Sequence, residues 1–158
     1  MDVSIGARFG YSDERRVLVV DDEETIADLI RDVLTRHGCV VDTNAGGHGS
    51  IDVAADGRYG LVISDFAIPG LNGLEFVRAL RMRNPHPQVL IVSAFLDPET
   101  VDLLRAEPSV VGLVRKPFDI FDLVRRVEAH FASRSAVALK PDSIPLGQPE
   151  ALRARYAD

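Results

Sequence analysis

The chain has 158 residues, 46% of them hydrophobic and 27% charged, with a net charge of −6. This length suits one folded domain with short tails. The acidic balance argues against direct nucleic-acid binding, because such domains usually carry a basic face. No apolar run reaches the roughly 18 residues that span a bilayer, and residues 1–15 lack the apolar centre of a secretory signal. The single Cys39 permits no internal disulfide and is typical of a reducing compartment. We therefore expect a cytoplasmic protein without membrane contact.

Strand-like apolar runs and helix-like segments alternate along the chain. After an irregular N-terminal extension, residues 1–15, strands are predicted at residues 17–20, 39–43, 61–64, 89–92 and 110–114. Apolar residues at helical spacing follow each run and predict helices around residues 26–34, 49–55, 74–80, 98–107 and 120–131. In the first helix, the predicted buried face consists of Ile26, Leu29, Ile30, Val33 and Leu34. Residues 133–158 contain three X-Pro steps and predict an irregular tail, with one short helix at 150–156.

Local signals mark several of these helix ends. Gly38 ends the first helix, and Asp97 with Pro98 provides an N-cap followed by proline at the first helical position. Asp119 is expected to cap the last helix.

Five consecutive β–α units predict an α/β protein, a three-layer sandwich around a five-stranded parallel sheet. The strand runs are almost entirely apolar, which is typical of strands covered on both faces. Right-handed crossovers and the flavodoxin-like order 2-1-3-4-5 place the first and third strands side by side, with a switch point between them. Ligands of such sheets bind at the carboxyl ends of the strands. We expect residues 16–132 to form this domain.

Residues able to handle a phosphoryl group follow four of the predicted strands. Asp21 and Asp22 follow the first strand, Asp65 the third, Ser93 the fourth and Lys116 the fifth. Ionised carboxylates a few ångströms apart repel by roughly 4 kcal/mol per pair at an effective dielectric near 20. Mg²⁺ suits such an oxygen-only site, and an aspartate is also a nucleophile that accepts phosphoryl groups. The lysine ammonium and the serine hydroxyl would bind phosphoryl oxygens. The sequence therefore predicts a site for a divalent cation and a phosphorylated aspartate.

This arrangement resembles the receiver domain of two-component response regulators, over roughly residues 16–132. The resemblance rests on four motifs in order, namely Asp21-Asp22, Asp65 with Pro69-Gly70 and Asn72-Gly73, Ser93-Ala94, and Lys116-Pro117-Phe118.

The resemblance implies a role for each matching residue. Asp65 would be the phosphoacceptor, Ser93 the switch hydroxyl and Lys116 the phosphoryl-binding lysine, with a cis Lys116–Pro117 bond. Mg²⁺ would be held by Asp65, by Asp22 directly, by Asp21 mostly through water, and by the backbone carbonyl of Ala67.

The same resemblance implies a single-domain response regulator that takes a phosphoryl group from a partner histidine kinase or phosphotransfer protein. It would catalyse its own Mg²⁺-dependent phosphorylation and dephosphorylation at Asp65, yet act mainly as a signalling switch. Its output would be phosphorylation-dependent contact with a downstream protein target.

One position departs from the family pattern. Receivers usually carry Tyr or Phe three residues before the lysine, and this chain has Leu113 there. The substitution motivates an alternative, a receiver-fold binding or dimerisation module with little dependence on phosphorylation. The run 110–114 is also unusually apolar, and an exposed patch there would be a partner or homodimer surface.

Other interpretations of the motifs stay open at this point. Asp21-Asp22 also fits a turn and helix cap, and the loop after Asp65 also fits turn chemistry alone. An aspartate-nucleophile phosphatase would carry a second carboxylate two residues after the nucleophile, where this chain has Ala67. The glycine-rich loop at residues 46–49 could cradle an anion, but it lacks the phosphate-loop and dinucleotide fingerprints, which favours an ordinary βα loop.

Overall fold

In the part of the chain that the structure describes, five strands form one parallel sheet, and five helices connect or follow them. The structure is a computed structural model that describes residues 15–56, 58–84 and 86–138. The strands of the sheet are β1 (Arg15–Val20), β2 (Cys39–Asn44), β3 (Leu61–Asp65), β6 (Val89–Ser93) and β7 (Val110–Arg115). The helices are α2 (Glu24–Arg36), α3 (Gly49–Ala55), α4 (Gly73–Arg83), α5 (Pro98–Ala106) and α6 (Ile120–Ala138).

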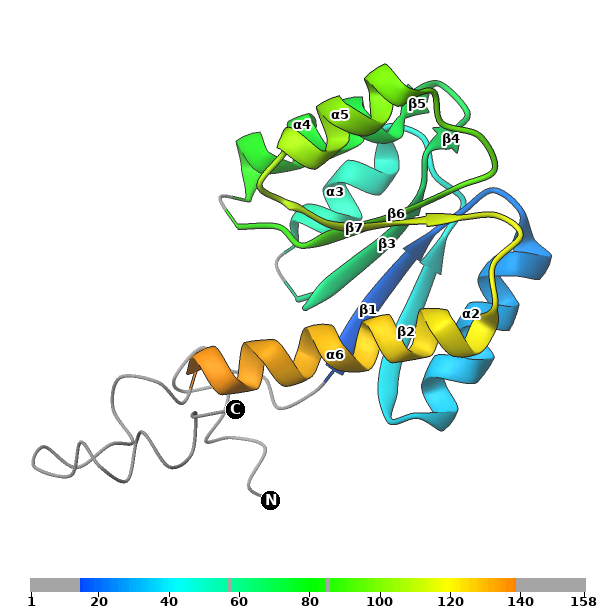
Figure 1. Cartoon of the computed structure of the whole chain (residues 1–158), viewed down its shortest axis with the longest axis vertical. Coiled ribbons are helices and arrows are strands. Elements are labelled where there is room, and N and C mark those ends of the chain that lie inside the picture. Colours follow the sequence, from blue (N-terminus) through cyan, green and yellow to red (C-terminus); the bar gives the residue numbers. More distant parts are fainter. Residues whose placement is uncertain (1–14, 57, 85, 139–158) are drawn as a thin grey trace, which may run out of the picture. The chain divides into compact units, whose positions relative to one another are not determined.

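The sheet has the order β2-β1-β3-β6-β7, and every neighbouring pair is parallel. Figure 1 shows the arrows of β1, β2 and β3 side by side and pointing the same way. The predicted α/β class, the five-stranded parallel sheet and the flavodoxin-like order are therefore confirmed. β1 and β3 are neighbours in the sheet, so the topological switch point lies between these two strands, as predicted.

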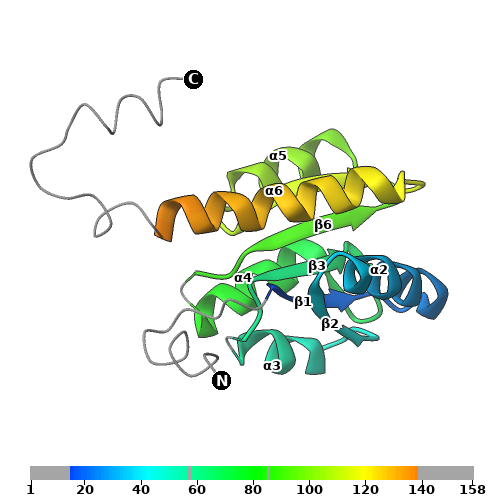
Figure 2. The ribbon, with the colours of Figure 1, turned by 90° about the horizontal axis from the view of Figure 1, so that it is seen from below.

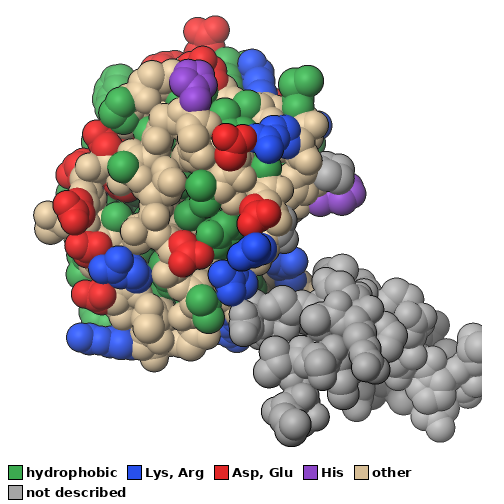
Figure 3. Space-filling view, turned by 180° about the vertical axis from the view of Figure 1, so that it is seen from behind, with side chains coloured by type: hydrophobic (Ala, Val, Ile, Leu, Met, Phe, Trp, Pro, Cys, Tyr) green, Lys and Arg blue, Asp and Glu red, His purple; other side chains and the backbone are tan. Residues whose placement is uncertain are grey.

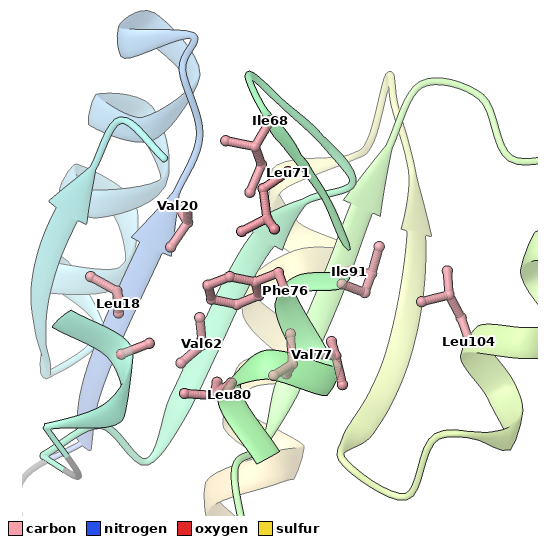
Figure 4. Close-up of a cluster of buried hydrophobic side chains, with 12 residues drawn as sticks. Leu18, Val20, Val62, Ile68, Leu71, Phe76, Val77, Leu80, Ile91 and Leu104 are labelled. Atoms are coloured by element: carbon pink, nitrogen blue, oxygen red, sulfur yellow. The ribbon is translucent and has the colours of Figure 1, made fainter. Parts of the chain in front are cut away.

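The core follows from the alternation of side chains along these strands. One face carries buried residues of β1, β3 and β6 that pack with buried residues of α3, α4 and α5, namely Leu18, Val20, Val62, Val89, Ile91, Ala54, Phe76, Val77, Leu80 and Leu104. Figure 4 shows Phe76, Val77 and Leu80 of α4 over the strands, and Figures 1 and 2 draw α3 next to α4. The alternate residues of β1, Val17 and Val19, point to the opposite face and are also buried. Both faces of the sheet are thus covered, as the apolar strands predicted.

The helix boundaries follow the predicted signals. The Asp97 side chain accepts a hydrogen bond from the Thr100 backbone N–H (2.9 Å), with Pro98 next in the chain. Asp119 accepts one from the Phe121 N–H (2.8 Å), and Gly38 follows α2 with a φ of 87°. Asn72 and Glu75 form a reciprocal capping box at the start of α4.

Three details differ from the sequence-based expectation. Leu29, predicted to face the core, is 48% exposed, because the buried stripe of α2 runs through Ala27, Ile30 and Leu34. The loop after Asp65 contains an unpredicted antiparallel hairpin of β4 (Ala67–Ile68) and β5 (Leu71–Asn72). Helix α6 continues to Ala138, so the prediction of an irregular tail is wrong for residues 133–138.

The rest of the predicted tail, including the short helix at 150–156, lies outside the described residues, as does most of the extension at 1–15. The chain divides into two compact units, Met1–Val124 and Arg125–Asp158. The described part of the second unit is the remainder of α6, in which Val127 and Phe131 are buried.

Within the described part of the chain, every helix is too short or too polar to span a bilayer. The face of the molecule drawn in Figure 3 mixes acidic and basic side chains.

Candidate functional site

The carboxyl ends of the central strands bring the predicted site residues to one edge of the sheet. Asp21 directly follows β1, Asp65 is the last residue of β3, and Ser93 is the last residue of β6. The strands are in register there, since Val20 pairs with Ser64 and Asp65 pairs with Val92. Polar side chains placed just beyond buried strands therefore share one edge.

Three carboxylates converge at this edge, and we call them the acid cluster. One oxygen each from Asp21, Asp22 and Asp65 lies within 4.8 Å of the others. The side chains of Asp21 and Asp65 are only 3% and 8% exposed, whereas Asp22 is exposed. Two carboxylates are thus held away from solvent, with a third at the surface beside them.

Lys116 reaches into the acid cluster from the loop after β7. Its Nζ lies 3.0 Å from Asp21 Oδ2 and 3.1 Å from Asp65 Oδ2, and its side chain is 10% exposed. The Lys116–Pro117 peptide bond is cis, as the resemblance implied. The Lys116 N–H donates to the Ser93 carbonyl (2.8 Å), which ties the lysine's backbone to the end of β6. Lys116 therefore forms one charged group with Asp21, which is 95 positions away in the sequence, and with Asp65, which is 51 positions away.

A single ammonium shared between two buried carboxylates leaves the site short of positive charge. Burial raises the pKa of Asp65, and the hydrogen bond from Lys116 only partly opposes that effect. Burial alone would lower the pKa of Lys116, but its hydrogen bonds to Asp21 and Asp65 prevail and raise it. Lys116 is therefore held protonated, while ionised Asp65 is not fully compensated.

Backbone groups orient both buried carboxylates. Asp21 Oδ1 accepts a hydrogen bond from the Glu23 N–H (2.8 Å). Asp65 Oδ1 accepts one from the Ala67 N–H (3.3 Å), and the Ser64 hydroxyl donates to the Asp65 carbonyl (3.0 Å). The Oδ1 atoms are thus turned toward backbone, and the Oδ2 atoms toward Lys116.

Ser93 is buried at the end of β6, and its hydroxyl donates to the backbone carbonyl of Phe95 at 3.1 Å. The structure therefore brings Asp21, Asp22, Asp65 and Lys116 together directly. Ser93 is joined to them through its backbone bond with Lys116. The Ala67 peptide is linked to Asp65, and its role as a metal ligand stays a prediction.

The donor set fits a small divalent cation. Three carboxylates against one ammonium leave an excess of negative charge, and a hard cation with oxygen ligands is the group that offsets such an excess. Zinc sites in proteins are built mainly from sulfur and nitrogen ligands, whereas this cluster offers carboxylate oxygens alone. The residues present thus suit Mg²⁺.

Two residues near the cluster were missed by sequence reasoning. Glu23 Oε1 lies 3.5 Å from Lys116 Nζ, and the acidic run that begins at Asp21 was the available signal. Asn44 accepts the Asp21 N–H through its backbone oxygen (3.0 Å), a contact without a local sequence signature.

Leu113, the departure from the family pattern, is half-buried on β7 and packs against the core cluster. β7 is an edge strand, and Val111 on it is 42% exposed. Of the apolar run 110–114, Val111 is thus the exposed side chain, and the role of this edge as a partner or homodimer surface stays a prediction.

A parallel α/β sheet with clustered aspartates and a lysine at its carboxyl edge is the arrangement that the resemblance to receiver domains predicts. The response regulator receiver domain family matches residues 17–128. The chain belongs to this family.

Individual relatives agree with this assignment. The chain is 36% identical over 114 residues to the uncharacterized transcriptional regulatory protein YkoG of Bacillus subtilis, covering 72% of this chain and 49% of the relative. It is 33% identical over 115 residues to the response regulator ArlR of Staphylococcus aureus, covering 72% and 51%. The chain thus matches only about half the length of these curated relatives.

Solved structures show the same fold. The chemotaxis protein CheY4 of Vibrio cholerae superposes with a TM-score of 0.66 at 29% identity, covering 73% of this chain and 98% of that chain. A response regulator receiver domain protein of Clostridium thermocellum gives 0.70 at 25% identity, covering 77% and 98%.

Proposed function

We propose that this chain is a phosphoryl-accepting switch, with Asp65 as acceptor and residues 16–132 as its receiver unit. The phosphoryl group would come from a partner histidine kinase or phosphotransfer protein. The output would be phosphorylation-dependent contact with a downstream protein. Membership of the receiver family supports the proposal.

The observation that carries it is the contact of Lys116 Nζ with both Asp21 and Asp65, at 3.0 and 3.1 Å, beside exposed Asp22. A lysine whose role is to form a single structural ion pair would have one carboxylate beside it, whereas Lys116 has three. The arrangement supplies a nucleophile, a fixed cation and oxygen ligands for a second cation at one point.

In the proposed transfer, an Asp65 carboxylate oxygen attacks phosphorus and a P–O bond forms. The P–N bond to the donor histidine breaks and its electron pair stays on that nitrogen. A donor ring that is protonated at its other nitrogen therefore leaves as neutral imidazole. Mg²⁺, when bound by Asp21, Asp22, Asp65 and the Ala67 carbonyl, supplies charge neutralisation for phosphoryl oxygens.

Lys116 then serves the product. Its ammonium already lies at Asp65, so it can move from the carboxylate to a phosphoryl oxygen without a large displacement. The Ser93 hydroxyl has a single proton, now donated to Phe95, and donation to a phosphoryl oxygen would replace that bond. The loop after β6 would thereby respond to the state of Asp65.

The test is incubation of the full chain with Mg²⁺ and acetyl phosphate, followed by intact-mass measurement. We expect a gain of one phosphoryl group that is lost in Asp65→Asn and on chelation of Mg²⁺. The matched control is Asp102→Asn at an exposed position of α5, which makes the same chemical change away from the cluster and should keep the adduct. An adduct that survives in Asp65→Asn, or none in the wild type, would contradict the proposal.

A second candidate is a binding or dimerisation module that depends little on phosphorylation. Half-buried Leu113 favours it, because the aromatic side chain usual at this position is absent. Sedimentation of the wild type and Asp65→Asn, with and without acetyl phosphate, separates the candidates. Self-association that is present and equal in all four samples supports the module, whereas association only in phosphorylated wild type supports the switch.

A further inference from the structure

The loop between β2 and α3 lies next to two segments that carry residues of the acid cluster, namely the end of β1 and the hairpin that follows Asp65. At the last residue of β2, the backbone oxygen of Asn44 accepts the Asp21 N–H (3.0 Å), and the Asn44 side chain accepts the Gly46 N–H (2.9 Å). Two residues beyond Asn44, Gly46 lies against Ile68 of the β4–β5 hairpin. The loop therefore reaches from the end of β1 to the segment that follows Asp65.

Gly46 has no room for a side chain. A Cβ built on it would lie 1.9 Å from Ile68 Cγ2 and 3.3 Å from Ile68 Cβ. Its φ is +99°, so glycine is also favoured by backbone conformation. The neighbouring Gly47 has a similar φ of +83°, but a Cβ there would meet only the Pro69 carbonyl oxygen at 3.9 Å. Both positions favour glycine by conformation, and only Gly46 needs it for space.

Ile68 cannot retreat easily from an added methyl group. It is 5% exposed and packs in the core with Leu71, and Figure 4 shows the two side chains together at the hairpin. Its branched Cβ restricts χ1, so the clashing methyl moves only with the whole side chain or the backbone. The hairpin is closed at its base by the Gly73 N–H donating to the Phe66 carbonyl (2.7 Å). A push on Ile68 therefore passes to the adjacent residue, Ala67.

Ala67 connects this contact to the phosphoacceptor, since its N–H donates to Asp65 Oδ1 at 3.3 Å. We propose that Gly46 is a positioning residue for the cation site. Because Gly46 has no side chain, Ile68 can pack against it, and this packing holds the adjacent Ala67 in the position from which its N–H donates to Asp65. The inference deepens the proposed function and rests on it. It assigns a role to the glycine-rich loop at 46–49, which carries no recognised phosphate-binding fingerprint.

The test compares Gly46→Ala with Gly47→Ala in the full chain, with Mg²⁺ alone as the probe. The Kd of Mg²⁺ is obtained from the dependence of the unfolding midpoint on metal concentration. The two variants share the backbone strain, so both should lose stability without metal. Only Gly46→Ala should weaken Mg²⁺ binding, by at least tenfold relative to Gly47→Ala, because loss of support behind metal ligands typically costs 10–100-fold in affinity.

A rescue separates positioning from general damage. Ile68→Ala removes the clashing Cγ2, so Gly46→Ala with Ile68→Ala should bind Mg²⁺ within threefold of Ile68→Ala alone. Ile68→Val keeps Cγ2 and should not rescue Gly46→Ala. The same rescue comparison serves if Gly46→Ala alone fails to fold.

Equal Mg²⁺ affinities of Gly46→Ala and Gly47→Ala, beside a wild type that binds, would overturn the inference and leave the proposed function intact. A tenfold deficit that persists in the double variant relative to Ile68→Ala would also overturn it. A wild type whose midpoint is insensitive to Mg²⁺ would instead overturn the proposed function, and the inference with it.

Discussion

Among the described residues, two clusters of charged side chains around buried carboxylates have opposite compositions. In the acid cluster, one ammonium serves Asp21 and Asp65, and Asp22 lies beside them. In the second group, which we call the Glu107 cluster, the carboxylate of Glu107 after α5 receives two guanidinium groups of α4. Arg78 Nε lies 3.0 Å from its Oε1, and an Arg81 terminal nitrogen lies 2.8 Å from its Oε2.

The pKa values move in opposite directions in the two clusters. The hydrogen bond from Arg78 lowers the pKa of Glu107, and burial opposes this less than the two arginines favour it. Burial raises the pKa of Asp65 despite its lysine. The carboxylate of Glu107 is thus paired with two guanidinium groups, whereas the acid cluster has three carboxylates beside one ammonium. The two ion clusters therefore differ in the balance of their charges.

Removing the lysine should give the largest effect. Lys116→Ala leaves Asp21 and Asp65 buried without a protein cation, and breaking a buried pair in this way costs about 3 kcal/mol of unfolding free energy. Urea unfolding without metal measures the loss, and Mg²⁺ should recover part of it. The control is Arg115→Ala, one residue earlier and exposed, with an expected change within about 0.5 kcal/mol. A Lys116→Ala variant as stable as this control would refute the charge deficit.

The same kind of removal in the Glu107 cluster should cost less. Glu107→Gln weakens two charge-assisted hydrogen bonds, but Arg78 and Arg81 are 56% and 42% exposed and regain water. We therefore expect a loss of about 1–2 kcal/mol, measured beside Asp102→Asn as a neutral reference.

The pH dependence of that loss has a definite sign. Because the folded pKa of Glu107 lies below its ordinary value of 4.5, the stabilisation is present above pH 4.5 and is lost as pH falls through the lowered value. The difference between wild type and Glu107→Gln should stay constant from about pH 8 to 6. It should then shrink below about pH 4.5. A difference that grows on acidification would contradict the assignment.

The acid cluster was predictable from sequence because the parallel topology determines where the residues that follow the strands lie. Asp21, Asp65 and Lys116 each follow an apolar run, and strands of one direction end at one edge whatever the intervening helices contain. The cis bond at Lys116 followed from the family resemblance. Burial of α2 was less predictable, since helical spacing marks a broad stripe and Leu29 lies at its exposed margin.

Contacts between separate connecting segments left no such pattern. Glu107 pairs with Arg81 and Arg78, which lie 26 and 29 positions away in the sequence on another helix. The sequence around Glu107 contains no local signal that predicts this pairing. The contact of Gly46 with Ile68 likewise depends on where an unpredicted hairpin is placed. Strand ends are fixed by topology, whereas these contacts are fixed by packing geometry.

The central claim is that the carboxylates of the acid cluster carry more negative charge than Lys116 offsets, so that binding of a divalent cation should stabilise the fold. The most direct measurement is the unfolding free energy of wild type, Asp65→Asn and Glu107→Gln, each with and without Mg²⁺. Without metal, Asp65→Asn should be more stable than wild type, because burial raises the pKa of Asp65 and its ionised carboxylate is therefore disfavoured in the folded protein, whereas Glu107→Gln should be less stable. A hundredfold excess of Mg²⁺ over Kd should add about 2.7 kcal/mol to wild type and to Glu107→Gln, and clearly less to Asp65→Asn. An Asp65→Asn variant that is less stable than wild type without metal, or that gains as much from Mg²⁺, would contradict the account.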